Sequence, residues 1–203
     1  MSRLGHSDGP IIAYPRLFVE WSDRGAHLNG RFPKFPATVY DKGWAYGVWY
    51  CGTAFTRARL YGEYPPTFLK RALGLFPDCP RVLHCPSGLV QHGITVDLVI
   101  SRDPSIVANA AALPFTNQCF DLVLSDPPYS TVDAQQYLTG PYPLQRAMCE
   151  AHRVLRIGGY FGMLHTMYPS YQRSKGWELQ ALIAVVTGFS KRTRMFSVFQ
   201  RTA

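Results

Sequence analysis

Long apolar runs are missing from this sequence, and so is an apolar core near its start. No stretch approaches the roughly 20 apolar residues that a membrane-spanning helix needs, and the opening MSRLGHSDGP does not resemble a signal peptide. The 203 residues, 47% of them hydrophobic, suffice for one well-buried domain. We therefore expect a soluble cytoplasmic protein that makes no use of a membrane.

Closely paired cysteines are also missing. The five cysteines are an odd number, and they are scattered along the chain without a CxxC pair. Reduced, buried thiols are the simplest interpretation. A zinc site made of Cys79, His84, Cys85 and His92 is the alternative, but this spacing matches no common zinc module, so we expect no metal.

Acidic residues are scarce, above all in the later part of the chain. Lysine and arginine number 21 against 13 acids, which gives a net charge of +8, and after position 133 the only acids are Glu150 and Glu178. Such a bias fits a polyanionic partner, and a merely solvated basic surface is the alternative. Our candidates for contacts with nucleic-acid phosphates are Lys191, Arg192 and Arg194.

The readable part of the chain alternates between strand and helix patterns. We expect helices at 65–76, 143–155 and within 177–189, and strands at 81–85, 93–99, 120–125, 160–165 and 193–201. Gly158 and Gly159 would end the second helix. Residues 1–50 show little periodicity and predict irregular structure, with one short hairpin turning at 41–43. This alternation predicts an α/β fold with a mostly parallel sheet.

The stretch FDLVLSDPPYS ends an apolar strand with one acid, two prolines and a tyrosine. Ligands of open α/β sheets bind beyond the carboxyl ends of the strands, which is where Asp126, Pro127, Pro128 and Tyr129 would lie. The prolines fix φ and remove two N–H donors. The Asp126 carboxylate and the Pro127 carbonyl are then two rigid acceptors beside an aromatic ring, although a simple rigid turn would use the same residue types.

Two acceptors beside an aromatic ring suit a planar group that bears an NH₂, such as a nucleobase. The lone pair of an exocyclic amine is delocalised into the ring, so the nitrogen is a poor nucleophile. Acceptors aimed at its hydrogens would free the lone pair and stabilise the positive charge that develops during attack. Stacking on Tyr129 would hold the base in line.

SDPPY resembles the amino-methyltransferase motif of S-adenosylmethionine-dependent class I methyltransferases of the DPPY type, especially the N6-adenine DNA enzymes. The neighbouring segments occur in a similar order: EYPPTFLKRAL, VLHCPSG, TVDLV, ANAAALPF and RVLRIGGYFGMLH. The likeness covers about residues 61–199. It implies a Rossmann-like class I methyltransferase fold with helices on both faces of the sheet.

The resemblance also implies a cofactor site for S-adenosyl-L-methionine. VLHCPSG takes the place of the glycine-rich cofactor loop, Asp97 that of the acid on the ribose hydroxyls, and ANAAALPF that of the segment on the cofactor adenine. The implied cofactor-binding residues are Tyr64, Pro65, His84, Cys85, Pro86, Ser87, Gly88, Asp97, Asn109 and Ala110.

The sequence departs from the family pattern at four points. The loop carries a single glycine, Gly88, where the family usually has two or three. Few residues separate Gly88 from the next strand, so the helix that normally follows the first strand must be shortened or absent. Asn109 replaces an acid that is frequent there, and no long insertion exists to act as a target-recognition domain.

We expect two regions and one reaction. Residues 1–60 would be an irregular region rich in aromatics, proline and glycine, packed on a methyltransferase domain at 61–203. The expected reaction is methyl transfer to an exocyclic amine of a nucleobase, adenine N6 in DNA. An RNA enzyme acting on adenine N6 or guanine N2 and a non-catalytic nucleic-acid-binding partner are the alternatives.

Overall fold

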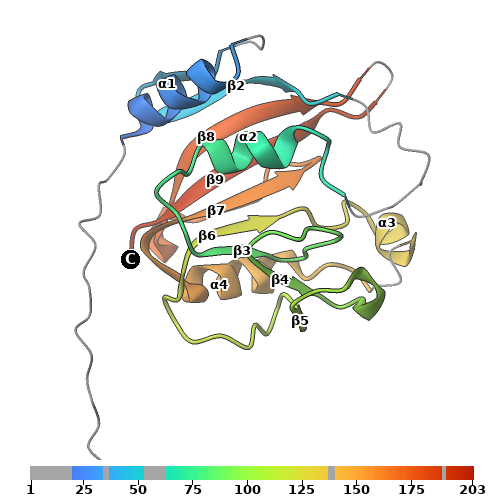
Figure 1. The fold of residues 1–203 in the computed structure, drawn as a ribbon. Coiled ribbons are helices and arrows are strands. Elements are labelled where there is room, and N and C mark those ends of the chain that lie inside the picture. The colour runs from blue at the N-terminus through green and yellow to red at the C-terminus, as the bar shows by residue number, and fades with distance from the viewer. Residues whose placement is uncertain (1–19, 34–36, 53–62, 137–139, 189–190) are drawn as a thin grey trace, which may run out of the picture.

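The computed structural model describes residues 20–33, 37–52, 63–136, 140–188 and 191–203. The predicted domain boundary at 60/61 and the start of the family-like segment lie outside these ranges. The described residues form one sheet of nine strands in the order β1-β2-β8-β9-β7-β6-β3-β4-β5 (Figure 1). The α/β class predicted from the sequence is thus confirmed.

The edge strands β1 and β5 are short, and the longest strands are β7, β8 and β9. The helices are α1 (Trp21–Arg31), α2 (Phe68–Gly74), α3 (Thr131–Gln136) and α4 (Leu144–Val154), with 3₁₀ turns η1 (Ile100–Arg102) and η2 (Arg173–Lys175). The strands are β1 (Val39–Asp41), β2 (Trp44–Tyr50), β3 (Val82–His84), β4 (Ile94–Asp97), β5 (Ile106–Val107), β6 (Phe120–Ser125), β7 (Leu155–His165), β8 (Trp177–Val186) and β9 (Arg194–Arg201).

The sheet is mostly parallel, as predicted. β5, β4, β3, β6 and β7 are paired in parallel, and so are β2 and β8. Only the pairs that involve β9 and the β1–β2 hairpin are antiparallel. Because parallel strands end on the same edge, the segments that follow β3, β4 and β6 meet there.

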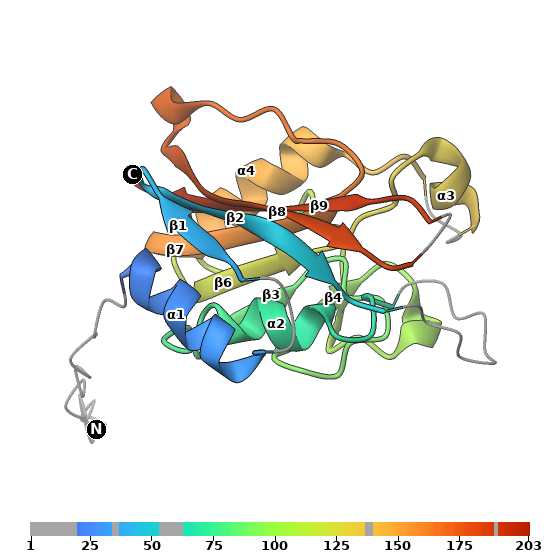
Figure 2. The ribbon, with the colours of Figure 1, turned by 90° about the horizontal axis from the view of Figure 1, so that it is seen from above.

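Helices cover both faces of the sheet (Figure 2). On one face α1 and α2 pack over a core that includes Trp49, Phe68 and Phe196. On the other face α4 packs over a second core that includes Met148 and Phe161. Adjacent residues of β6 therefore point into different cores, which explains why all six residues from Phe120 to Ser125 are buried.

No helix lies between β3 and β4, where the described segment 85–93 forms turns only. The prediction of a shortened helix after the first strand of this motif is therefore confirmed. Gly93 shows how tightly the turn meets the sheet: its φ is +66°, and a Cβ there would lie 2.6 Å from the Val82 carbonyl oxygen. Glycine meets both requirements at no steric cost.

Two expectations about secondary structure are wrong. Residues 177–186 form β8 rather than a helix, since Ala181, Ile183 and Val185 face one core while the residues between them are also apolar. A strand that is buried on both faces is apolar at nearly every position, so it lacks the alternation of apolar and polar residues that marks a strand in the sequence. Residues 1–50 are not wholly irregular, because α1 lies within them. The expected hairpin is present, and its β2 continues the main sheet by pairing with β8.

The end of α4 differs from the prediction as well. The helix ends at Val154, and β7 begins at the next residue and runs through Gly158 and Gly159. Gly159 fits this strand because a Cβ would lie 3.0 Å from the Asp121 carbonyl oxygen on β6. The glycines thus allow close approach of two strands rather than ending a helix.

A buried charge cluster ties together the edge of the sheet where β6 and β7 begin. The Asp121 carboxylate accepts hydrogen bonds from the guanidinium groups of Arg81 at 2.9 and 3.0 Å and of Arg156 at 2.5 Å. Burial opposes ionisation of Asp121, but the hydrogen bonds from the two arginines hold its pKa below the ordinary value. These contacts join the residue before β3 to the first residues of β6 and β7.

Candidate active site

A cavity of about 350 Å³ opens at the carboxyl ends of β3, β4 and β6. Its size lies within the usual range for small-molecule sites. Its walls come from four segments far apart in the sequence: Cys85, Pro86, Ser87 and Gly88; Asp97, Leu98 and Arg102; Ala108, Asn109, Ala110 and Ala111; and Gly140, Pro141, Tyr142, Pro143 and Arg146. Tyr64, Val96, Asp126 and Pro128 complete it.

Asp97, the last residue of β4, organises the loop after β3. Its Oδ2 accepts hydrogen bonds from the Gly88 N–H at 2.9 Å and from Arg102 at 3.1 Å, and its Oδ1 accepts one from the Val99 N–H at 3.0 Å. A carboxylate offers about four acceptor positions, so these donors use most of them. The side chain is 2% exposed. If Asp97 binds the ribose hydroxyls as predicted, it would do so through the one acceptor position that these three donors leave free.

Polar groups without partners face this part of the cavity wall. The hydroxyls of Ser87 and Tyr64 are buried and make no hydrogen bond to any residue that the structure describes. Buried polar groups of this kind normally bind a ligand or water. Gly88 has a φ of +54°, a left-handed conformation that favours glycine, and it turns the loop along the cavity. These features fit a polar cofactor, with the loop, Asp97 and Tyr64 as the residues that would hold it.

Asn109 and Ala110 lie on the wall formed by the segment after β5. The Asn109 side-chain oxygen accepts a hydrogen bond from the Ala111 N–H at 2.9 Å. This turn leaves the amide NH₂ as the free end of the side chain. A donor at this position suits a ring nitrogen of adenine better than its amine.

Asp126 follows β6 directly and lies on the wall of the same cavity. Its side chain is 16% exposed and its Oδ2 lies 3.9 Å from Arg194 Nη1. Its Oδ1 accepts a hydrogen bond from the Tyr129 hydroxyl. Burial raises the pKa of Asp126 to about 6, although Arg194 and Tyr129 act in the opposite direction. A carboxyl group with this pKa can hold or release a proton near neutral pH.

Tyr129 is engaged on three sides. Its hydroxyl binds Asp126, the guanidinium of Arg194 lies 5.3 Å from its ring centre, and the ring of His165 meets it edge-on at 5.1 Å. Nδ1 of His165 accepts a hydrogen bond from the Met167 N–H at 2.9 Å, which fixes that ring. Stacking of a base on Tyr129 would thus require Arg194 to leave the ring face.

Most of the predicted site residues line the cavity, and the others lie behind it or beside it. Pro65 and Pro127 are buried outside the wall, and Tyr129 adjoins it through Asp126. His84 is fully buried next to the rings of Tyr64 and His92, and burial lowers its pKa to about 4. It is therefore a neutral side chain behind the cofactor loop.

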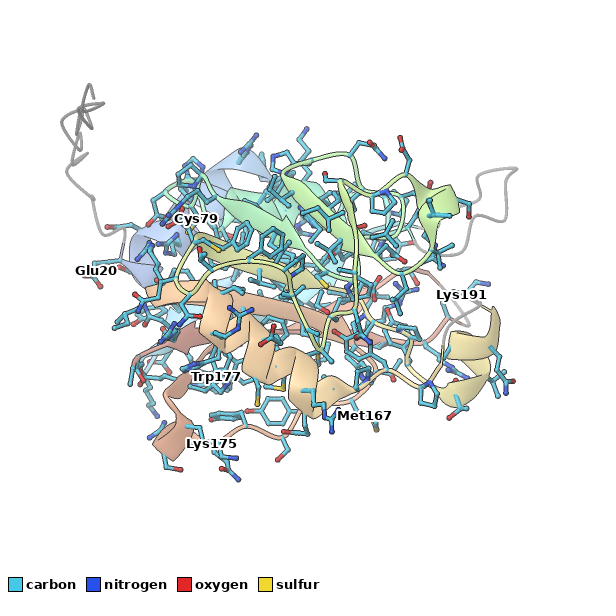
Figure 3. All side chains as sticks on the ribbon, turned by 90° about the horizontal axis from the view of Figure 1, so that it is seen from below. Glu20, Cys79, Met167, Lys175, Trp177 and Lys191 are labelled. Atoms are coloured by element: carbon cyan, nitrogen blue, oxygen red, sulfur yellow. The ribbon has the colours of Figure 1, made fainter. Side chains whose placement is uncertain are left out.

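The three basic residues predicted to contact phosphates have different surroundings. Lys191 and Arg192 are exposed between β8 and β9. Arg194 begins β9, is 26% exposed and lies against Asp126 and Tyr129. Figure 3 shows Lys191 at the end of the molecule where α3 lies, whereas Lys175 and Trp177 lie at the opposite end.

Sequence reasoning missed several residues of the cavity. Arg102 and Arg146 put positive charge on its wall, and Tyr142 adds a phenol whose oxygen lies 3.5 Å from Ser125 Oγ. Tyr142 belongs to the motif GPYP, whose prolines and glycine could have marked it as a rigid loop. Arg102 gave no such signal, because its ion pair with Asp97 depends on the turn η1.

Comparison with known proteins supports a methyltransferase fold. Residues 95–163, which run from β4 through β7, match the model of a family described as "Methyltransferase domain". Among solved structures, TrmN from Thermus thermophilus is similar with a TM-score of 0.50 and 20% identity, over 73% of this chain and 52% of that one. The chain has the class I methyltransferase fold.

Two further solved structures have lower scores. The putative methyltransferase yhhF from Escherichia coli has a TM-score of 0.43 and 13% identity, over 71% of this chain and 90% of that one. An rRNA methylase from Streptococcus thermophilus has a TM-score of 0.41 and 8% identity, over 60% and 87%. No curated protein sequence matches the chain.

The matched domain and the fold bear out S-adenosylmethionine as the predicted cofactor and support an S-adenosylmethionine-dependent methyltransferase. The chain spans about half the length of TrmN. Within the described residues, no three His, Cys, Asp or Glu side chains gather closely enough to hold a metal ion. None of the helices that the structure describes is long and apolar enough to cross a membrane.

Proposed function

We propose that this protein transfers a methyl group from S-adenosylmethionine to an exocyclic amine of a nucleobase, with adenine N6 in DNA as the target. The observation that carries the proposal is the position of Asp126. Its carboxylate and the cofactor-loop residues Ser87 and Gly88 line one cavity, so an acceptor for an amine and the methyl donor would be neighbours.

The chemistry of Asp126 fits an amine substrate. When bound, S-adenosylmethionine supplies an electrophilic methyl group on sulfur. Ser87, Gly88 and Asp97 would hold this cofactor, which would give up its methyl to the amine nitrogen and keep the electrons of the C–S bond. The positive charge that develops on nitrogen is stabilised by the ionised Asp126 carboxylate. The surplus proton then passes from nitrogen to Asp126, whose pKa of about 6 suits a base that must release the proton to water afterwards.

The net charge of +8 favours a nucleic acid over a free base as the carrier of this amine. A base stacked inside a duplex could not reach Asp126, so the target must be flipped out or lie in a single strand. Arg194 and Tyr129 would have to separate when the base arrives, because the arginine now lies over the ring face.

A non-catalytic nucleic-acid-binding role is the second candidate. The observation that favours it is Asp97, whose carboxylate is already bonded to Gly88, Val99 and Arg102. Cofactor binding separates the two candidates. We expect the protein to bind S-adenosylmethionine with micromolar affinity, about −8 kcal/mol, and Asp97→Asn to weaken it, while Asp41→Asn on the distant hairpin should bind like the native protein.

The decisive experiment is mass spectrometry of nucleosides from DNA and RNA incubated with protein and cofactor. The proposal expects N6-methyladenosine in its deoxy form, absent with Asp126→Asn and present with Asp41→Asn. If methylated nucleosides appear only in the RNA samples, the substrate is RNA and not DNA. Native protein that binds no cofactor in calorimetry would establish the non-catalytic role instead.

A further inference from the structure

Part of one face of the sheet lies beyond the reach of α4, and none of the residues that the structure describes covers it. Successive residues of β2 alternate between the two faces, so Ala45 and Trp49 enter the core under α1 while the residues between them face away. The outward-facing set consists of Trp44, Tyr46, Val48 and Tyr50 of β2 with Leu182, Ala184 and Val186 of β8. We call these seven residues the β2 face.

The β2 face is apolar, aromatic and accessible. Tyr46, Val48 and Tyr50 are 39%, 47% and 44% exposed, and the rings of Trp44 and Tyr46 lie 5.6 Å apart. Apolar patches of this kind on a protein surface usually mark a binding site. The remainder of this side of the sheet is covered by α4 and by Tyr168 and Tyr171, which pack on Phe199.

The β2 face leads directly to the candidate active site. Strand register places His165 opposite Met195, Met195 opposite Ala184, and Ala184 opposite Val48. Directly paired residues point to the same face of a sheet, so these four side chains form one row. At about 4.8 Å per strand the row spans about 14 Å. Its inner end, His165, touches Tyr129.

Charge around this row suits a phosphate backbone. Tyr50 is paired with Val186, and Lys191 and Arg192 are exposed in the connection that follows β8 at the same end of the sheet. Arg194 begins β9 beside Asp126. The residues of the β2 face are uncharged, and the acid beside them is Asp41, which pairs with Trp44 at the end away from the candidate site. A nucleic-acid strand running along the face toward the site would therefore meet stacking surfaces first and basic side chains near the site.

We infer that the β2 face is a stacking platform for the unpaired nucleotides that flank the target base in a single-stranded nucleic acid. The inference rests on the proposed function, since it says where the nucleic-acid strand lies when its target base enters the cavity. Aromatic side chains beside basic residues bind single strands with little sequence preference, because every base has a π-face. Such a platform would also supply the contacts that a target-recognition domain supplies elsewhere.

The test measures binding of labelled single-stranded DNA and RNA oligonucleotides by fluorescence anisotropy at low salt. Tyr46→Ala and Tyr50→Ala should each weaken binding about fivefold to a hundredfold, and the double variant more. Tyr46→Phe with Tyr50→Phe should bind like the native protein, because a phenyl ring stacks equally well. Tyr40→Ala is the matched control: Tyr40 is 38% exposed on the same hairpin, but its pairing with Ala45 places it on the opposite face.

Methylation kinetics separate failure of this inference from failure of the proposed function. The double alanine variant should lose kcat/KM on a long single strand and keep it on a trinucleotide too short to reach the β2 face. If the native protein methylates nucleic acid but the double alanine variant binds and reacts like Tyr40→Ala, the platform is refuted and the function stands. If the native protein neither binds nor methylates any oligonucleotide, both are refuted. A native dimer in light scattering that the double variant dissociates would identify the face as an interface between copies and overturn the inference.

Discussion

Replacing Asp126 by asparagine should abolish methyl transfer and stabilise the protein at the same time. The amide keeps the size of the carboxyl group but removes its charge. The neutral amide oxygen of asparagine stabilises a positive nitrogen much less than a carboxylate does and cannot take up its proton, and loss of such a group typically costs about 10²- to 10³-fold in rate. Cofactor binding should be unchanged, because the cofactor loop is held by Asp97.

The gain in stability follows from the pKa of Asp126. Folding raises this pKa from an ordinary 3.8 to about 6. The folded protein therefore holds the proton more tightly than the unfolded chain, so stability is greatest below pH 4 for this group and falls as the pH rises through 6. At about 1.4 kcal/mol per pKa unit, the ionised carboxylate costs up to about 3 kcal/mol at pH 8. Asparagine removes this cost, less the loss of the bond from Tyr129.

Thermal unfolding at pH 5 and pH 8 measures the effect. The native protein should lose more stability between these pH values than Asp126→Asn, and the variant should melt several degrees higher at pH 8. Asp41→Asn, an exposed aspartate, is the control and should follow the native protein. A variant that melts lower at pH 8, or that retains full methyl transfer, would refute the reasoning about Asp126.

Three further predictions concern charged residues. Arg194→Met should shift the acidic limb of the pH–rate profile of methyl transfer to higher pH, because Arg194 holds down the pKa of Asp126; an unshifted limb would contradict the contact. Lys191→Ala and Arg192→Ala should each reduce the slope of log affinity for nucleic acid against log salt by about 0.7 to 0.9 and leave cofactor affinity unchanged, whereas a native slope in the double variant would make this loop a solvated surface only. Asp121→Asn should cost about 1.5–3 kcal/mol in urea unfolding, mainly because Arg156 loses its charged partner, whereas Arg81 is half-exposed and regains water; because its pKa is lowered by folding, the contribution of Asp121 should also fade as the pH drops through its folded pKa.

The sequence predicted well the elements whose patterns are local. Residues 120–125 were expected as a strand and are β6, since an apolar run that ends in Asp126 and two prolines has one clear boundary. The turn at Lys42 and Gly43 was also foreseen, and both residues have positive φ. The order of the family-like motifs predicted Cys85–Gly88, Asp97, Asn109, Ala110 and Asp126 as site residues, and these residues line the cavity.

Other features depend on distant partners and left no local trace. β8 pairs with β2 and β9, so its strand conformation is decided by neighbours that no window of sequence contains. Arg194 was expected to face phosphate, but its contact with Asp126 arises because β9 lies antiparallel to β7. Likewise, the bonds from Gly88 and Arg102 to Asp97 require the segments around β3 and β4 to meet in space.

The pairing of β2 with β8 has a consequence for the order in which the protein can be made. Ala45 leaves the ribosome well before its partner Ala181, because most of the sheet lies between them in the sequence. Until β8 emerges, the hairpin has one unpaired edge and the sheet is incomplete. Non-local pairing of this kind slows folding and exposes strand edges to aggregation. A nascent chain would therefore keep Trp49 and its neighbours exposed until β8 has emerged, and chains stalled before β8 should be clients of chaperones.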